Sequence, residues 1–364
     1  MAYTTINKST DYFRTKLYTG NASNDTAITF DESTNMQPDL IWIKNRSASQ
    51  SHALFDAIRG ATKRLSSNSS SAESTENTNL DSFDTNGFTV DNEAIVNGSG
   101  NSMVAWNWKA GTTSGIATNA DSDITPTAYS FNATSGFSIV KYTGNGSGST
   151  GVPHGLGKKP EFFIIKKTSG TDSWICYHQG ISNNGTTYIV LNSSAASGSS
   201  NNPFNGWQSD TVNFYLGSAG DTNGSGATFI AYCFASVDGF SKVGSYVGNG
   251  NANGTFIYTG FKPAFIIFKR RDNTGEWYIK DNRRSGTAAL QNIGQMNPNQ
   301  TQYVAASSNQ VENKTSGYAM DILSNGFKAR GTDSGINANG GEYIYYAVAE
   351  APLVGSNNIP CTAR

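Results

Sequence analysis

The sequence has little charge and no long hydrophobic run. Asp, Glu, Lys and Arg make up 15% of the 364 residues, and the formal net charge is -1. Proteins that neutralise nucleic-acid phosphates cluster Lys and Arg, so no nucleic-acid partner is expected. No apolar run approaches the ~20 residues of a membrane helix, and the start, MAYTTINKSTDYF, lacks the apolar segment of a signal peptide. We therefore expect cytoplasmic synthesis and no membrane insertion.

Cysteine is also scarce. Cys176, Cys233 and Cys361 are an odd number at no metal-ligand or redox spacing. Cys176 and Cys233 lie in apolar segments, where a free thiol behaves as a small buried hydrophobe. The fold is therefore expected to form without disulfides, and no metal site is predicted from cysteine.

Catalytic signatures are missing as well. His52, His154 and His178 have no Ser/Asp partner in a nucleophile motif. They are interpreted as strand-end or turn residues, with His154 capping backbone groups. The acidic segments that begin at Asp121 and Asp221 lack the ligand spacing of a calcium loop. We expect no enzymatic activity, no metal and no cofactor.

What the sequence does contain is one module used three times. Its first landmark is a proline-led apolar segment, PDLIWIKN from Pro38, PEFFIIKK from Pro160 and PAFIIFKR from Pro263. A second segment begins fourteen residues after each proline, at His52, Trp174 and Trp277. Later landmarks are a phenylalanine, a Gly/Asn turn and a closing aromatic, at Phe88, Asn97 and Trp106, at Phe214, Asn223 and Tyr232, and at Phe327, Asn337 and Tyr346. A repeat of roughly a hundred residues is the size of a small domain.

The repeat and the composition between repeats predict the domain boundaries. We expect an N-terminal arm over 1–12, modules over 13–111, 129–239 and 240–352, a linker over 112–128 and a C-terminal tail over 353–364. The linker is assigned because it lacks apolar periodicity.

Hydrophobic alternation predicts β-strands. The closing strands place large side chains such as Val104, Trp106 and Trp108 on one face. The proline-led strands are apolar on both faces, which favours central strands covered by a neighbouring module or subunit. We predict an all-β chain of three tandem antiparallel β-sandwich modules, jelly-roll-like, with one helical turn around 55–63.

An Asp-x-x-Arg pair occurs after the second segment in two modules, Asp56/Arg59 and Asp281/Arg284. It could bind a sugar, because carboxylate and guanidinium groups form bidentate contacts. The alternative is a salt bridge that fixes the turn after a strand. We favour the salt bridge, because both modules keep the pair at the same place.

Three loops differ most between modules and are the best candidates for recognition: 66–80, 201–210 and 291–315. Trp207 and Phe204 in the second loop and Tyr303 in the third are the predicted ligand-binding residues, since aromatic rings stack on sugars. Such aromatics also commonly pack under their own loop.

The repeated segments PDLIWIKNR, LFDAIRGATK, GFSIVKYTGNG, HGLGKKPEFFIIKK and GFKPAFIIFKRRDNTGEWYIKD resemble a module found repeatedly in structural proteins of marine bacteriophages. The resemblance covers nearly the whole chain. It implies a virion component of the tail-fibre or appendage type, without enzymatic activity and without assigned site residues.

The expected function is therefore that of a virion structural protein, tail-associated, that attaches to host-surface glycan and contacts other virion proteins. A homo-oligomer, with a trimer favoured, is expected by analogy with phage fibres. One alternative is a head-decoration or appendage-anchoring protein that docks through residues 1–12. A remote alternative is an enzyme that degrades surface polysaccharide.

Overall fold

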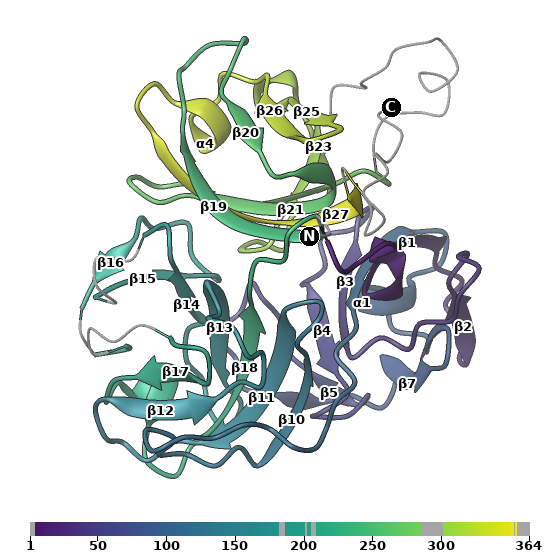
Figure 1. Ribbon diagram of the computed structural model, residues 1–364. Coiled ribbons are helices and arrows are strands. Elements are labelled where there is room, and N and C mark those ends of the chain that lie inside the picture. Colours follow the sequence, from purple (N-terminus) through teal and green to yellow (C-terminus); the bar gives the residue numbers. More distant parts are fainter. Residues whose placement is uncertain are drawn as a thin grey trace.

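The chain folds into three β-rich lobes around a common centre (Figure 1). The computed structural model describes residues 4–181, 186–200, 202–204, 209–284, 301–352 and 354. Within these ranges the helices are single turns, and none is long and apolar enough to cross a membrane. The predicted all-β fold is confirmed, with several antiparallel sheets and no helical bundle.

The first module packs a larger sheet against a smaller one. The larger sheet has the order β1 (Phe13–Thr19), β9 (Ser102–Trp108), β3 (Leu40–Asn45) and β4 (Ala53–Asp56). The smaller has the order β2 (Thr26–Thr29), β8 (Gly87–Val90) and β7 (Leu80–Asp84). The hairpin of β5 (Lys63–Arg64) and β6 (Ser74–Thr75), the turn η1 (Ser9–Asp11) and α1 (Ala94–Asn97) complete it.

The second module repeats this plan. Its larger sheet has the order β10 (Ala128–Asn132), β11 (Phe137–Thr143), β18 (Thr228–Phe234), β13 (Phe162–Lys167), β14 (Ile175–His178), β15 (Thr187–Val190) and β16 (Gly198–Ser199). Its smaller sheet pairs β12 (Thr150–Pro153) with β17 (Asn213–Leu216), and α2 (Gly220–Asn223) precedes the closing strand.

The third module has the same arrangement. Its larger sheet has the order β19 (Ser241–Val247), β27 (Glu342–Pro352), β21 (Phe261–Arg270), β22 (Trp277–Asp281), β23 (Gln302–Ala305) and β24 (Asn313–Lys314). Its smaller sheet has the order β20 (Phe256–Tyr258), β26 (Gly326–Ala329) and β25 (Met320–Leu323), with η2 (Ser316–Tyr318) and α4 (Ser334–Asn337) beside it.

The proline-led strands divide their side chains between two cores. In β3, Ile41 and Ile43 face the core between the two sheets of their own module. Leu40 and Trp42 face the other way, into a cluster shared by all three modules. Side chains alternate along a strand, so an uninterrupted apolar run needs cover on both faces. The expected second cover is supplied by the neighbouring modules of the same chain.

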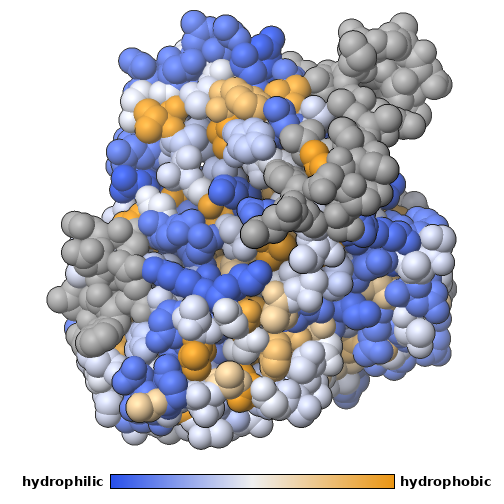
Figure 2. Space-filling model, viewed as in Figure 1, coloured by the Kyte–Doolittle hydropathy of each residue, from blue (hydrophilic) through white to orange (hydrophobic). Residues whose placement is uncertain are grey.

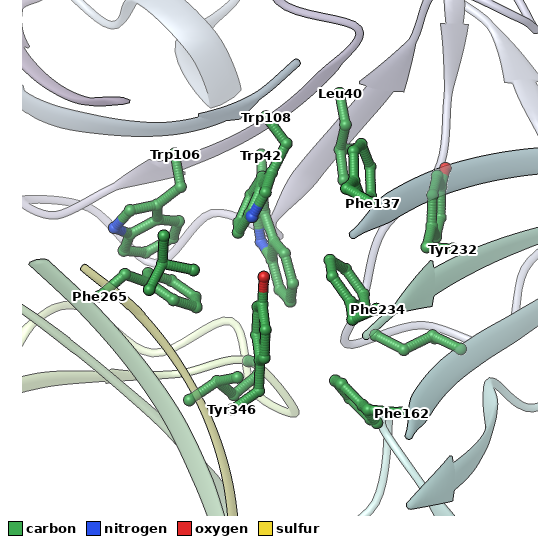
Figure 3. Packing of buried hydrophobic residues seen from close by; sticks show 14 of the residues in the cluster. Leu40, Trp42, Trp106, Trp108, Phe137, Phe162, Tyr232, Phe234, Phe265 and Tyr346 are labelled. Carbon is green, nitrogen blue, oxygen red and sulfur yellow. The ribbon is translucent and has the colours of Figure 1, made fainter. Parts of the chain in front are cut away.

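The shared cluster is an aromatic core at the centre of the molecule (Figure 3). Trp108 of the first module lies 5.3 Å from Phe265 of the third, measured between ring centroids. Phe234 of the second module lies 4.7 Å from Tyr346 of the third. Buried aromatics contribute most of the apolar area in such a core. An isolated module would expose its share of this surface, so the three modules stabilise one another.

A buried asparagine locks each sandwich at the end of its short helix. The segment predicted as a Gly/Asn turn is a single helical turn that ends at Asn97, Asn223 or Asn337, each completely buried. In the second module the Asn223 Nδ2 group donates to Asn145 Oδ1 at 3.0 Å, and Asn145 N donates back to Asn223 Oδ1 at 2.9 Å. The other two modules repeat this reciprocal pair, as Asn97 with Asn21 and Asn337 with Asn249.

The residue before the partner asparagine must be glycine. A Cβ atom at Gly144 would lie 2.5 Å from the carbonyl oxygen of Gly224, and Gly20 and Gly248 show the same close approach in the other modules. The YTGN and YVGN segments are therefore fixed by sterics as well as by hydrogen bonding.

Two local predictions concern residues 55–63 and 112–128. The helical turn predicted around 55–63 does not extend into a helix: this stretch forms β4, a turn in which Gly60 N donates to Asp56 O at 3.0 Å, and the start of β5. The segment predicted as a linker has no extended strand before residue 128, but it runs along β12, where Ser122 forms a parallel bridge with Gly151. Ile124 is 6% exposed and belongs to the core of the second module.

Replacing Gly144 with alanine is expected to destabilise the protein by about 2 kcal/mol, because the new methyl group meets backbone atoms that have little room to move. Gly220→Ala is the matched control, since a Cβ there meets nothing within 4 Å. Chemical denaturation of both variants measures the difference. Equal stabilities would show that the close approach at Gly144 relaxes without cost.

Candidate functional site

Three equivalent loops are each held by the module that follows in a ring. The donor is the ring N–H of the residue fourteen positions after the strand proline. The bonds run from Trp174 to Ser66 O at 3.0 Å, from Trp277 to Val190 O at 2.9 Å, and between His52 Nε2 and Ala305 O at 3.0 Å. The second module thus holds the first, the third holds the second, and the first holds the third.

A buried lysine strengthens each junction. Lys44, Lys166 and Lys269 follow the apolar run of the three proline-led strands, and each is completely buried. Each ammonium donates to a carbonyl in the neighbouring module's loop, to Asn309 O at 3.3 Å, Ser70 O at 3.1 Å and Ser194 O at 3.0 Å respectively. Burial lowers the pKa of all three lysines to about 8, and the carbonyl oxygens replace the water that the ammonium loses.

Backbone hydrogen bonds close the same three junctions. They run from Glu73 N to Thr168 O at 3.1 Å, from Ser197 N to Arg271 O at 2.9 Å and from Glu312 N to Arg46 O at 3.0 Å. All three acceptors stand eight residues after the strand proline. The junctions are therefore equivalent in backbone geometry as well as in side chains.

The Asp-x-x-Arg pairs are salt bridges that fix the turn, as favoured from the sequence. The Arg59 guanidinium donates to Asp56 Oδ2 at 2.5 Å, and Arg59 N donates to Asp56 Oδ1 at 2.9 Å. Both side chains are inaccessible to solvent. Tyr232 of the second module also donates to Asp56 Oδ2, at 2.7 Å. A sugar has no access to the Asp56/Arg59 pair. Besides fixing the turn, the pair joins the first module to the second.

The pair in the third module is built in the same way. Arg284 binds Asp281 at 2.5 Å and Glu312 at 2.9 Å, and Trp106 of the first module donates to Asp281 at 2.9 Å. At the equivalent place in the second module, His178 Nε2 contacts Tyr345 O at 3.1 Å instead. This position is therefore occupied by an ion pair in the first and third modules and by a neutral imidazole in the second.

All three histidines are held by backbone groups. In His154 and His178, Nδ1 accepts from the N–H two residues further along the chain, at 3.1 and 3.0 Å, and Nε2 faces a carbonyl. In His52, Nδ1 accepts from Trp42 Nε1 at 2.8 Å. Both ring nitrogens of each neutral imidazole are therefore occupied, which agrees with the capping interpretation of His154. Burial lowers the pKa of His52 to about 3 and those of His154 and His178 to about 4.

A polar pocket of about 500 Å³ lies beneath the candidate loop 66–80 of the first module. Its lining is dominated by serine hydroxyls, from Ser51, Ser66, Ser69, Ser71 and Ser74. Arg64 and Glu93 add one charge of each sign, and the nearly buried side chains of Leu65 and Ile95 complete the lining. The sequence pointed to the loop but not to these two charged residues, which lie outside it.

The structure holds the wall of this pocket in place from two sides. Within the module, the Arg64 guanidinium pairs with Glu76 at 2.9 Å. From the second module, Trp174 donates to both Ser66 O and Ser69 O, and Lys166 donates to Ser70 O. The pocket is therefore shaped by the junction between the first and second modules.

The predicted aromatic binding residues occupy three different situations. Phe204 is completely buried in the second module's core, with its ring centroid 5.4 Å from that of Phe163 and 5.8 Å from that of Tyr177. It has no free face for a sugar, so direct stacking on Phe204 is ruled out by packing, as the alternative of a loop aromatic under its own loop anticipated. Trp207 lies outside the described residues.

Tyr303 is half-buried in β23 and belongs to a cluster of three tyrosines. Its ring centroid lies 4.6 Å from Tyr318 and 5.1 Å from Tyr278. Burial raises the pKa of Tyr303 to about 12. The ring of Tyr303 packs against those of Tyr278 and Tyr318. A ligand role for Tyr303 stays a prediction.

Metal ligands do not gather in the described part of the chain, where no group of three or more His, Cys, Asp or Glu residues could hold an ion. Cys176 and Cys233 are free and buried, and burial raises the pKa of both thiols. They are the small hydrophobes expected from the sequence.

The fold and the junctions define an all-β protein whose three repeated modules close into one ring. Residues 8–352 match the model of a family described as a domain of unknown function, DUF7483, and the chain belongs to that family. Comparison with curated proteins and with solved structures gave no match. The family match spans all three modules, in keeping with a unit that folds as a whole.

Acid is expected to destabilise the protein through its histidines. Their pKa values lie near 3 to 4 when folded and near 6.5 when unfolded, so the unfolded chain binds more protons below about pH 6.5. Each histidine then lowers the free energy of unfolding by about 1.4 kcal/mol per pH unit down to its folded pKa. Denaturation between pH 7 and 5, where most carboxylates stay ionised, measures this slope. His178→Gln, which keeps an amide donor but does not titrate, should make it shallower; an unchanged slope would contradict the assignment.

Lys166→Met is expected to cost about 2–4 kcal/mol, because carbonyl groups of Ser70 and Asp172 lose their shared donor inside the junction. Lys167→Met is the control. Its ammonium is partly exposed and lies 3.7 Å from Asp172, so its loss should change stability by less than about 1 kcal/mol. Similar effects of the two variants, measured by thermal or chemical denaturation, would show that the buried lysine does not hold the junction.

Proposed function

We propose that this protein is a structural component of a virus particle, associated with the tail, that binds glycan on the host surface. The resemblance of the repeated segments to phage structural proteins supports the first part. The polar pocket under loop 66–80 carries the second part, because its size and lining suit a polyhydroxylated ligand.

The chemistry of the pocket favours a sugar. Serine hydroxyls both donate and accept hydrogen bonds, and so match the hydroxyl groups of a saccharide. The Arg64 guanidinium and the Glu93 carboxylate lie on the same lining and can each contact two neighbouring hydroxyls. Leu65 and Ile95 also touch the pocket but are only 1% and 6% exposed, so the contacts expected with a ligand are mainly polar. A pocket held by Trp174 and Lys166 needs little ordering on binding, which favours affinity.

Binding, rather than hydrolysis, is the role we assign to this pocket. Glycoside hydrolysis ordinarily uses two carboxyl groups on either side of the scissile bond. Among the residues that line the pocket, Glu93 is the one carboxylate. The function proposed is therefore attachment.

Blocking the pocket tests the glycan-binding role. Ser71 lines the pocket and is exposed, so Ser71→Trp should fill the space without disturbing the core. We expect loss of binding to host cells and to host surface glycans immobilised as an array. Thr29→Trp, at an exposed position of β2 away from the pocket, is the control and should bind normally. Equal binding by both variants at unchanged thermal stability would sink the assignment of this pocket.

The place on the particle needs a separate measurement. Antibody fragments against this chain, imaged on intact particles, should label the tail. Label spread over the head would replace tail attachment with decoration of the capsid lattice, and absence of label from particles would contradict a virion role.

A further inference from the structure

The three modules differ in how the edge strand of the smaller sheet is protected from pairing with another strand. In each smaller sheet the first strand, β2, β12 or β20, lies at the edge and is paired on one side. An unpaired edge is a template for another strand, and proteins usually protect it with charge, proline or a covering segment. The residues at this edge therefore indicate whether a module prevents or allows pairing with another strand.

The first two modules protect this edge. Asp25 and Asp31 stand on either side of β2, and Asp31 pairs with Lys16 at 2.7 Å, so charged groups flank this edge. In the second module the segment before β10 covers β12: the N–H groups of Asp123 and Ile124 donate to Gly151 O at 2.9 and 3.1 Å. This shows that the small sheet of the module accepts an added strand.

Among the described residues, the third module has none of these protecting features at its edge. Residues 249–260 contain no charged residue and no proline, and β26 is the one strand in the described chain that pairs with β20. Phe256 is 44% exposed, Tyr258 is 55% exposed, and Val247 beside them is 55% exposed. They are three of the four large hydrophobic side chains that the described residues expose. Figure 2 shows hydrophobic residues grouped among hydrophilic ones on this lobe.

The backbone of β20 also points its free groups outward. Ala329 N donates to Thr255 O at 3.2 Å, and Thr259 N donates to Asn325 O at 3.0 Å. In an antiparallel ladder, residues that bond across alternate with residues that face away. The N–H and C=O groups of Phe256 and Tyr258 therefore face the open edge, and their side chains share one face.

We propose that β20 pairs, antiparallel, with β20 of a second copy of this chain. A twofold axis at Ile257 places Phe256 opposite Tyr258 of the other copy, and the reverse. The two residues then exchange both backbone bonds, so the contact contains four N–H···O bonds and two aromatic cross-strand pairs. Such an interface is self-complementary, as a twofold contact must be. The uncharged edge offers it no repulsion.

The contact is small, so it is expected to form at high concentration or where many copies are held together, as on a particle surface. Sedimentation equilibrium of the full chain from about 1 µM to about 1 mM should show reversible dimerisation. Phe256→Lys combined with Tyr258→Lys places like charges opposite each other and should weaken association by at least about tenfold. Val311→Lys, at the remaining exposed large hydrophobe, is the control.

A charge-reversed variant tests the orientation. With Phe256→Lys and Tyr258→Asp, each introduced lysine faces an introduced aspartate across the twofold axis. This variant should associate more strongly than the one with two lysines, and added salt should weaken it. The proposal is overturned if the protein stays monomeric to about 1 mM, if the two lysines leave association unchanged, or if the charge-reversed variant associates no better. Thermal unfolding of each variant checks that the exposed substitutions leave the fold intact.

Discussion

The closed ring depends on a set of donors that are buried in one module and satisfied by the next. Lys44, Lys166 and Lys269 each place a buried ammonium group in a junction, where it donates a hydrogen bond to a carbonyl oxygen of the neighbouring module. A buried ammonium group destabilises the folded state unless the carbonyl oxygens that accept its hydrogen bonds are held in position. The loops that provide those carbonyls are therefore fixed, and the pocket wall in the first module is fixed with them. The contacts that join the modules therefore also shape the pocket.

The shared aromatic core explains why the modules are equivalent but not interchangeable. Each contributes one face of its larger sheet to the centre, and the rings of Trp108, Phe265 and Phe234 meet there. The inward faces of the proline-led strands are thus buried within one chain. The three modules of one chain bury the faces that three separate subunits would otherwise cover. Association between chains would therefore involve the outer surfaces of the ring.

Much of the fold was readable from the sequence, because the repeat exposed it. The alternation in the closing strands and the double apolarity of the proline-led strands predicted sandwiches with a second covered face, and both features are present. The closed ring could not be predicted from the sequence, because it depends on which carbonyl oxygen accepts a hydrogen bond from each buried lysine and ring N–H group. The repeated lysine after each apolar run was a signal for those donors. Its partners lie in loops whose sequences differ, such as Ser70 and Asn309.

The candidate site was harder to predict. The variable loop 66–80 was identified, but Arg64 and Glu93, which lie outside it, come to line the same pocket only after folding. Phe204 shows the reverse case: an aromatic in a polar loop suggested exposure, whereas Phe163 and Tyr177 bury it. Composition around a residue indicates a loop, and it does not reveal which way the side chain turns.

Covalent linkage of the three modules has one more consequence, which concerns stoichiometry. A ring of identical subunits must repeat every surface feature three times. In this chain a polar pocket lies at loop 66–80 of the first module, and a covering segment lies along β12 of the second. The exposed aromatic edge strand, β20, belongs to the third module. The described features therefore differ between modules, so one chain places a polar pocket and an open strand edge on different modules at a fixed relative orientation.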